Sequence, residues 1–167
     1  IELLASRIFK NSQTSASTMS QLTSEHHDAH WILHQCPEHI QRWFSKQPIK
    51  SIVLGSLFPS VKLPSIGIDF YSASRHATGH LLAKGHRRIG FIRFRSELAG
   101  DNQAIDGMKA AMDAHGSEIP LPKPIILSHN FHLERLVNTL DQVCSSENRP
   151  TALIIVNHHH YITTFSH

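Results

Sequence analysis

Short apolar runs alternate along the chain with longer stretches in which apolar residues recur at helical spacing. A short apolar run predicts a β-strand, and the contiguous residues Ile52, Val53 and Leu54 suit a parallel-sheet strand that is buried on both faces. The predicted strands and strand-like runs are 1–9, 31–34, 49–54, 65–68 with its approach through Val61 and Leu63, 89–92, 124–127 and 151–156.

Amphipathic helices with start and stop signals lie between these runs. Pro37 suits the first turn of one helix, Ser72 is a favourable N-cap for the next, and Gly85 is placed to end that helix. The apolar stripes are Ile40, Trp43 and Phe44; Ala73, Ala77, Leu81 and Leu82; Ile105, Met108 and Met112, closed by Gly116; and Leu133, Leu136, Val137, Leu140 and Val143, with Cys144 on the same face. A short helix is predicted at 19–27, a polar turn at 96–102, and a further helix from about Tyr161.

This order of elements predicts an α/β fold. Strands that alternate with helices form right-handed βαβ units, which produce parallel sheets with helices on both faces. Ligands of such sheets bind at the carboxyl ends of the strands, so we expect binding residues in the segments that follow each predicted strand. The chain begins and ends abruptly, and we expect it to be a fragment.

Composition narrows the class of protein. With 40% hydrophobic and 17% charged residues the chain is predicted to be globular. The net charge of +3 is spread out except for Arg87, Arg88, Arg93 and Arg95, which we interpret as solvated strand ends, with a phosphate-binding stripe as the open alternative. Two distant cysteines give no disulfide framework, and no membrane span or signal peptide is visible, so we predict a soluble protein of a reducing compartment.

Fifteen histidines raise the question of a metal site. His26, His30 and His34 recur every four residues but span a predicted passage from helix to strand, and consecutive residues such as those at 158–160 point to opposite faces of a strand. We therefore favour structural or solvated histidines and predict no metal. No nucleophile elbow, zinc-protease motif or phosphate loop is present, so we predict no enzyme activity and no cofactor.

One segment carries a family resemblance. Ile68, Asp69 and Phe70 are followed by a helix and then by the sequence Gly-His-Arg-Arg-Ile at 85–89, which resembles the pattern of lactose/galactose-type repressors. Gly107 resembles the glycine of that family's Arg-x-x-Gly-Phe helix, and Pro-Thr-Ala at 150–152 with Asn157 resembles its Pro-Thr-Ala, strand, Asn-Asp element. The resemblance covers roughly 64–163.

The resemblance implies two lobes of periplasmic-binding-protein-like fold with an effector between them. We assign residues 1–86 to part of the first lobe and 87–167 to part of the second, both incomplete, and find no helix-turn-helix headpiece in the chain. The family's sugar-binding arginine is replaced by Ala104, and its aspartate by His158. Arg95 or Asp101 is a candidate substitute for the missing arginine. The predicted ligand-binding residues are Ser56, Phe58, Asp69, Arg95, Asp101, Asn157 and His158.

The implied function is that of a cytoplasmic, sugar- or small-molecule-responsive transcription regulator, a repressor. Its expected partners are a small-molecule effector, expected to be a sugar, operator DNA through a headpiece not present in this chain, and a second copy in a homodimer, with no membrane. An exported sugar- or solute-binding protein of the same fold is the alternative.

Overall fold

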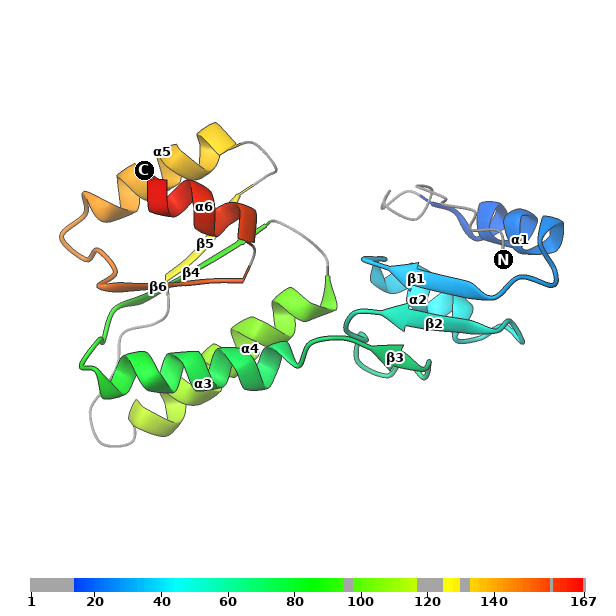
Figure 1. Ribbon diagram of the computed structural model, residues 1–167, viewed down its shortest axis with the longest axis horizontal. Helices are drawn as coiled ribbons and strands as arrows, with labels where there is room; N and C mark the ends of the chain where they lie inside the picture. Colours follow the sequence, from blue (N-terminus) through cyan, green and yellow to red (C-terminus); the bar gives the residue numbers. More distant parts are fainter. Residues whose placement is uncertain (1–13, 95–97, 117–124, 130–132, 157, 167) are drawn as a thin grey trace. The chain divides into compact units, whose positions relative to one another are not determined.

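The computed structural model describes residues 14–94, 98–116, 125–129, 133–156 and 158–166 (Figure 1). They fall into two compact units: the first ends at Ile68 and takes in the short stretch around Ala99, and the second contains the rest. The sequence predicted a division near His86, whereas here α3 (Phe70–Ala83) belongs to the second unit, because its Leu82 lies in that unit's core. The assignment of 1–86 and 87–167 to two lobes stays a prediction. The predicted strand at 1–9 lies outside the described residues.

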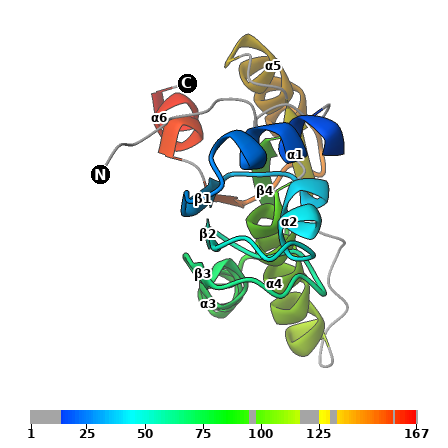
Figure 2. The same cartoon turned by 90° about the vertical axis from the view of Figure 1, so that its right-hand side faces the viewer.

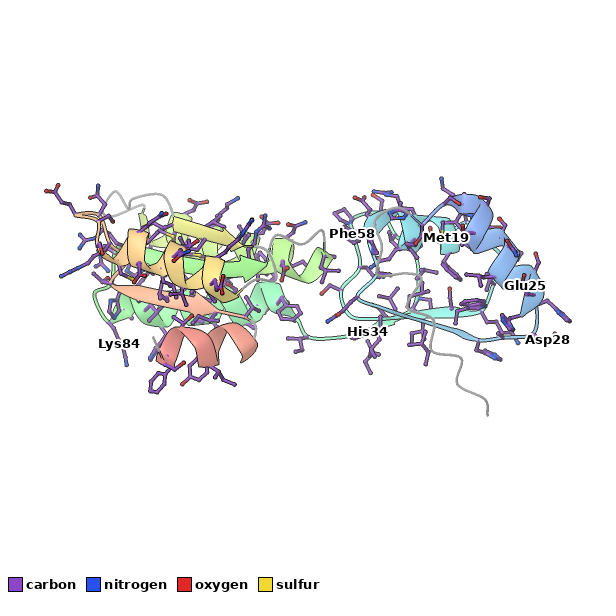
Figure 3. The ribbon with its side chains drawn as sticks, turned by 90° about the horizontal axis from the view of Figure 1, so that it is seen from above. Met19, Glu25, Asp28, His34, Phe58 and Lys84 are labelled. Atoms are coloured by element: carbon purple, nitrogen blue, oxygen red, sulfur yellow. The ribbon has the colours of Figure 1, made fainter. Side chains whose placement is uncertain are left out.

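The first unit contains a parallel three-stranded sheet in the order β1-β2-β3. Two helices, α1 and α2, lie on the same side of these strands (Figures 2 and 3). Side chains along a strand point alternately to the two faces of the sheet. Leu33 and Val53, which pair with each other, therefore point to the same face and form a core with Ile40 and Phe44. The elements are α1 (Ala16–Glu25), β1 (Trp31–His34), α2 (Glu38–Phe44), β2 (Ser51–Leu54) and β3 (Ser65–Ile66).

The other face of this sheet carries apolar side chains that remain exposed. Ile52 is 37% exposed and Leu54 45%, so the prediction that residues 52–54 are buried on both faces is wrong for these two. The physical reason is that the helices described for this unit both pack on the Val53 side. We call this surface the open face; it consists of Ile32, Ile52, Leu54 and Ile66.

The second unit is a parallel sheet in the order β5-β4-β6 with helices on both faces. Ile89 and Phe91 of the central strand pack with α3 and α4, while Ile92 packs with α5 on the opposite face. Figure 1 shows α3 and α4 on one side of the strands and α5 and α6 on the other. The elements are α3, β4 (Ile89–Phe94), α4 (Ala99–Gly116), β5 (Ile125–His129), α5 (Leu133–Cys144), β6 (Ala152–Ile155) and α6 (His158–Ser166). Among the described helices, none combines the length and the apolar character that a membrane crossing requires.

Several local predictions are corrected by the structure. Asp69, not Ser72, is the N-cap of α3, and the buried stripe of that helix is Ser74, Thr78 and Leu82. The Thr78 hydroxyl donates to the Ser74 carbonyl oxygen (2.8 Å), so its polar group is satisfied inside the helix and can be buried. Ala73 and Ala77, which were predicted to lie on the apolar stripe of this helix, are exposed. Helix α4 begins at Ala99, inside the stretch predicted to be a turn. Cys144, predicted to lie on the apolar face of its helix, is exposed.

Candidate functional site

The segment that follows β2 holds two of the predicted ligand-binding residues, Ser56 and Phe58, and is attached to α2. The Gln41 amide nitrogen donates to the Ser56 carbonyl oxygen (3.1 Å), and the Phe58 backbone N–H donates to the Gln41 amide oxygen (3.1 Å). At the next residue of the helix, the Arg42 guanidinium donates to the Pro59 carbonyl oxygen (3.2 Å). The backbone of this segment is therefore fixed by side chains of a helix that is itself anchored in the core.

Two glycines bring the carboxyl ends of β2 and β3 together just before this segment. The Gly55 N–H donates to the Ile66 carbonyl oxygen (2.8 Å), and Gly55 has φ +136°, a conformation that favours glycine. A Cβ atom on Gly67 would lie 2.8 Å from the Gly55 carbonyl carbon and oxygen. The close approach holds Ser56 at the carboxyl edge of the first sheet, where ligands of parallel sheets bind.

The side chains of Ser56 and Phe58 differ in what they offer. Within the described residues, the Ser56 hydroxyl oxygen is shielded from solvent and has no hydrogen-bond partner. Such a group is costly unless a partner arrives, so it is suited to a ligand hydroxyl. The Phe58 ring is 6% exposed and packs with Val61 and Ala99, so it presents little surface to a ligand in this structure.

Asp69 and Asp101, predicted as ligand contacts, lie near helix N-termini in the second unit. The Asp69 carboxylate accepts from the Ser72 backbone N–H (2.9 Å), and that hydrogen bond holds the pKa of Asp69 below its ordinary value. Asp101 lies in the first turn of α4, where the Arg93 guanidinium donates to the Asn102 side-chain oxygen (3.3 Å) and joins the end of β4 to the helix. Ala104, at the family's arginine position, is fully buried in the core, so no ligand contact comes from that residue here.

The side chains of the remaining predicted contacts lie outside the described part of the structure. Arg95 and Asn157 lie outside the described residues. His158 is the first residue of α6, and its side chain lies outside the described part of the structure. As binding residues, all seven stay predictions.

The Gly-His-Arg-Arg-Ile segment has an architectural role. Gly85 (φ +90°) ends α3 in a Schellman motif, in which its own N–H donates to the Leu82 carbonyl oxygen and the His86 N–H donates to that of Leu81. The Arg87 guanidinium also donates to the Leu82 carbonyl oxygen (2.8 Å). These contacts fix the exit from α3, and they favour our interpretation of the arginines as strand-end residues over a phosphate-binding stripe.

The same segment is bonded to the Pro-Thr-Ala element, the other motif that carries the family resemblance. His86 Nδ1 lies 3.1 Å from the Thr151 hydroxyl oxygen, and Arg88 Nε donates to the Arg149 carbonyl oxygen (2.9 Å). The Thr151 N–H donates to the Arg88 carbonyl oxygen (2.8 Å). The two most specific motifs in the sequence thus form one contact that joins β4 to β6.

The histidines and cysteines do not gather into a metal centre in the part of the chain that can be described. His26 caps the end of α1 and His34 lies on β1, so the four-residue spacing is not carried on one helix. In the described ranges no three His, Cys, Asp or Glu side chains lie close enough to share a metal ion. Cys36 is buried, and burial raises the pKa of its thiol to about 11.

Sequence reasoning missed Gln41 as a residue of this region. The available signal was a polar residue next to Ile40 on the face of α2 that is otherwise apolar. Its partners, however, lie 15 and 17 residues further along the chain, and no motif links them.

The complete arrangement agrees with a family model described as "Periplasmic binding proteins and sugar binding domain of LacI family", which matches residues 1–162. The chain belongs to this family. The predicted resemblance and the predicted class of fold, with parallel sheets flanked by helices, are therefore confirmed.

Individual members of the LacI-related family match parts of the chain. Catabolite control protein A of Priestia megaterium is 22% identical over 119 residues, which cover 71% of this chain and 35% of that protein. The HTH-type transcriptional repressor PurR of Vibrio vulnificus is 33% identical over 81 residues, covering 48% of this chain and 24% of that protein. The chain therefore spans about a quarter to a third of the length of these curated relatives.

Solved structures of the family share the fold. A regulatory protein of LacI family from Chloroflexus aggregans superposes with a TM-score of 0.73 at 20% identity, and the match covers 93% of this chain and 57% of that protein's chain. At that identity the likeness establishes the fold and leaves the effector and the operator to proposals.

Proposed function

We propose that this chain is part of the effector-binding, dimer-forming region of a cytoplasmic transcription repressor that responds to a sugar or a similar small molecule and catalyses no reaction. The observation that carries the proposal is the match of residues 1–162 to the LacI-family sugar-binding model. The names of the relatives, a catabolite control protein and a transcriptional repressor, support regulation over export. Operator DNA would be bound by a headpiece outside this chain.

The effector is proposed to be rich in hydroxyl groups. The unsatisfied Ser56 hydroxyl at the edge of the first sheet supports this, because a sugar hydroxyl both donates and accepts hydrogen bonds. In the second unit, Asp69 and Asp101 are the proposed contacts among the described residues. Phe58, Arg95, Asn157 and His158 complete the proposed set.

The proposed mechanism is a shift between two arrangements of the effector-binding region. An effector moves that equilibrium only by the difference between its affinities for the two arrangements, about 1 to 3 kcal/mol in typical cases. In a homodimer the change reaches two DNA-binding heads at once, which suits a near-palindromic operator.

The test uses the protein as its gene encodes it. Thermal unfolding is measured with D-ribose, D-galactose, D-glucose and glucose 6-phosphate, and a gel-shift assay on DNA of its own promoter is run with and without each sugar. A sugar that both stabilises the protein and changes DNA binding supports the proposal. Stabilisation without any DNA binding would favour an exported solute-binding protein.

A pair of serine variants makes the assay specific to the site. Ser51 begins β2 and Ser56 follows its carboxyl end, and both hydroxyl oxygens are buried and without a partner in the described residues. Ser56→Ala is expected to weaken the binding of the stabilising sugar about tenfold, as the loss of one ligand hydrogen bond does, while Ser51→Ala leaves it unchanged. Equal affinities for the two variants would remove Ser56 from the site.

A further inference from the structure

Gln41 is the most deeply buried long polar side chain among the described residues of the first unit, with 2% of its surface exposed. It shares the core side of α2 with Ile40 and Phe44. A buried amide is costly unless its donors and its acceptor are paired, so its hydrogen bonds reveal what the residue does. Two of these bonds go to the backbone of the segment that follows β2, and the Gln41 side chain is also a hydrogen-bond partner of the Cys36 thiol.

The two bonds form a bidentate attachment. The amide nitrogen holds the Ser56 carbonyl oxygen and the amide oxygen holds the Phe58 N–H, each at 3.1 Å, so the peptide units on either side of Leu57 are fixed in position and direction. The helix that carries Gln41 is anchored by Ile40 and Phe44, neither of which is exposed to solvent. The helix end of this attachment, at Gln41, is therefore held firmly by the core.

From this geometry we infer that Gln41 is a positioning residue of the effector site, which sets the place of the Ser56 hydroxyl without touching the effector. The inference rests on the proposed function, because it takes Ser56 as an effector contact. A core residue of α2 would thus influence effector affinity indirectly, through the backbone of the segment that holds Ser56. A loop that is free to move would lose affinity, since the effector would then have to order it.

The first measurement needs no effector. In Gln41→Met the side chain keeps its length but loses both hydrogen bonds, and hydrogen exchange at the Phe58 amide is expected to accelerate about tenfold relative to the Val53 amide. The Val53 N–H of β2 donates to the carbonyl oxygen of Pro64, just before β3, and its exchange is expected to follow the unfolding of the unit as a whole. An unchanged ratio of the two exchange rates would overturn the inference.

Two control variants separate positioning from stability. Gln21→Met makes the same chemical change on α1, where the Gln21 amide donates to the exposed Glu25 carboxylate (2.9 Å). Ile40→Val lowers the stability of α2 by removing a core methyl group and leaves the Gln41 amide intact. Neither variant is expected to change the ratio of the Phe58 and Val53 exchange rates.

The second measurement uses the sugar of the four-sugar panel that stabilises the wild-type protein most. Gln41→Met is expected to raise its Kd at least tenfold, with both control variants within about twofold of the wild type. If that sugar binds Gln41→Met as tightly as the wild type, the inference fails while the proposed function stands. If no sugar binds the wild type, the proposed function and the inference fail together, whatever the exchange rates are.

A second variant at the same position remains informative if Gln41→Met does not fold. In Gln41→Glu a protonated carboxyl can donate to Ser56 and accept from Phe58, whereas a carboxylate can only accept. The sugar affinity of this variant, taken relative to that of the wild type at the same pH, is therefore expected to fall as pH rises from about 5 to about 8. The Cys36 thiol, a titratable group beside Gln41, stays neutral across this range because burial raises its pKa to about 11. A relative affinity that is below that of the wild type and does not change with pH would contradict the bidentate role.

Discussion

Replacing Gly107 by alanine should destabilise the second unit, although alanine is the better helix former. Gly107 lies in the middle of α4, where the backbone of α3 passes close to it. A Cβ atom at this position would collide with the Tyr71 carbonyl oxygen and would lie 2.9 Å from the Tyr71 carbonyl carbon and 3.1 Å from the Arg75 nitrogen. All three are backbone atoms, so no side chain can rotate out of the way.

The size of the effect follows from two opposing contributions. Forcing an extra methyl group into a packed contact costs about 1 to 3 kcal/mol, and the upper end applies where the backbone must move. Replacing glycine inside a helix returns about 1 kcal/mol, so the net loss for Gly107→Ala is about 2 kcal/mol. At Gly79, inside α3, a Cβ atom would meet no other described part of the chain within 4 Å, and Gly79→Ala should gain about 1 kcal/mol.

Urea unfolding followed by far-UV circular dichroism measures both variants against the wild type. Both tryptophans, Trp31 and Trp43, lie in the first unit, so their fluorescence follows that unit separately. The expected result is a separation of about 3 kcal/mol between Gly107→Ala and Gly79→Ala in the transition of the second unit. A Gly107→Ala protein as stable as Gly79→Ala would refute the close approach of α3 and α4.

Three further predictions concern side chains with defined partners. The pKa of Asp69 is lowered in the folded protein, so its stabilising contribution is present above the ordinary carboxyl pKa and is lost as pH falls through the lowered value. Asp69→Asn keeps a capping oxygen but does not titrate, so the melting temperature of this variant should drop less between about pH 7 and pH 3 than that of the wild type. An equal drop in the two proteins would contradict this. A thiol-reactive disulfide reagent at about pH 8 should modify Cys144 in the native protein and Cys36 only after unfolding, because burial raises the pKa of Cys36 to about 11. Rapid modification of both cysteines in the native protein would contradict the burial of Cys36. Arg87→Met should lower the free energy of unfolding in urea by about 1 kcal/mol, because the Leu82 carbonyl oxygen loses its charged donor. An unchanged free energy of unfolding would show that this bond makes no net contribution to stability.

The second unit was largely predictable from sequence. Its strands are short apolar runs, and α5 shows a strong helical period of apolar residues, so periodicity alone located β4 and α5. The buried face of α3 was less predictable, because Ala73 and Ala77 resemble an apolar stripe as much as Ser74 and Thr78 resemble a polar one. The internal hydrogen bond of Thr78 allows that residue to be buried, and sequence does not display this bond.

The position of the candidate site was predictable from the sequence, but the residues that hold its backbone in place were not. Strand ends can be located from the hydrophobic pattern, which is how Ser56 was found at the edge of the first sheet. Gln41 was missed because its role depends on two backbone groups that only the fold brings beside it. The exposure of Ile52 was missed for a related reason. A contiguous apolar run predicts a strand that is buried on both faces, but it does not identify the helices that would pack on each face.

The central position of β4 sets the order in which the second unit can assemble on the ribosome. Ile89 pairs with Ala152, which is synthesised 63 residues later, and the hydrogen bonds that Arg88 donates to Arg149 and accepts from Thr151 form only then. At about 5 to 20 residues per second, β4 waits for about 3 to 13 s with an unpaired edge. During that time its apolar residues need protection, and a pause in translation before Thr151 would lengthen the interval in which a nascent chain is open to aggregation or to capture by a chaperone.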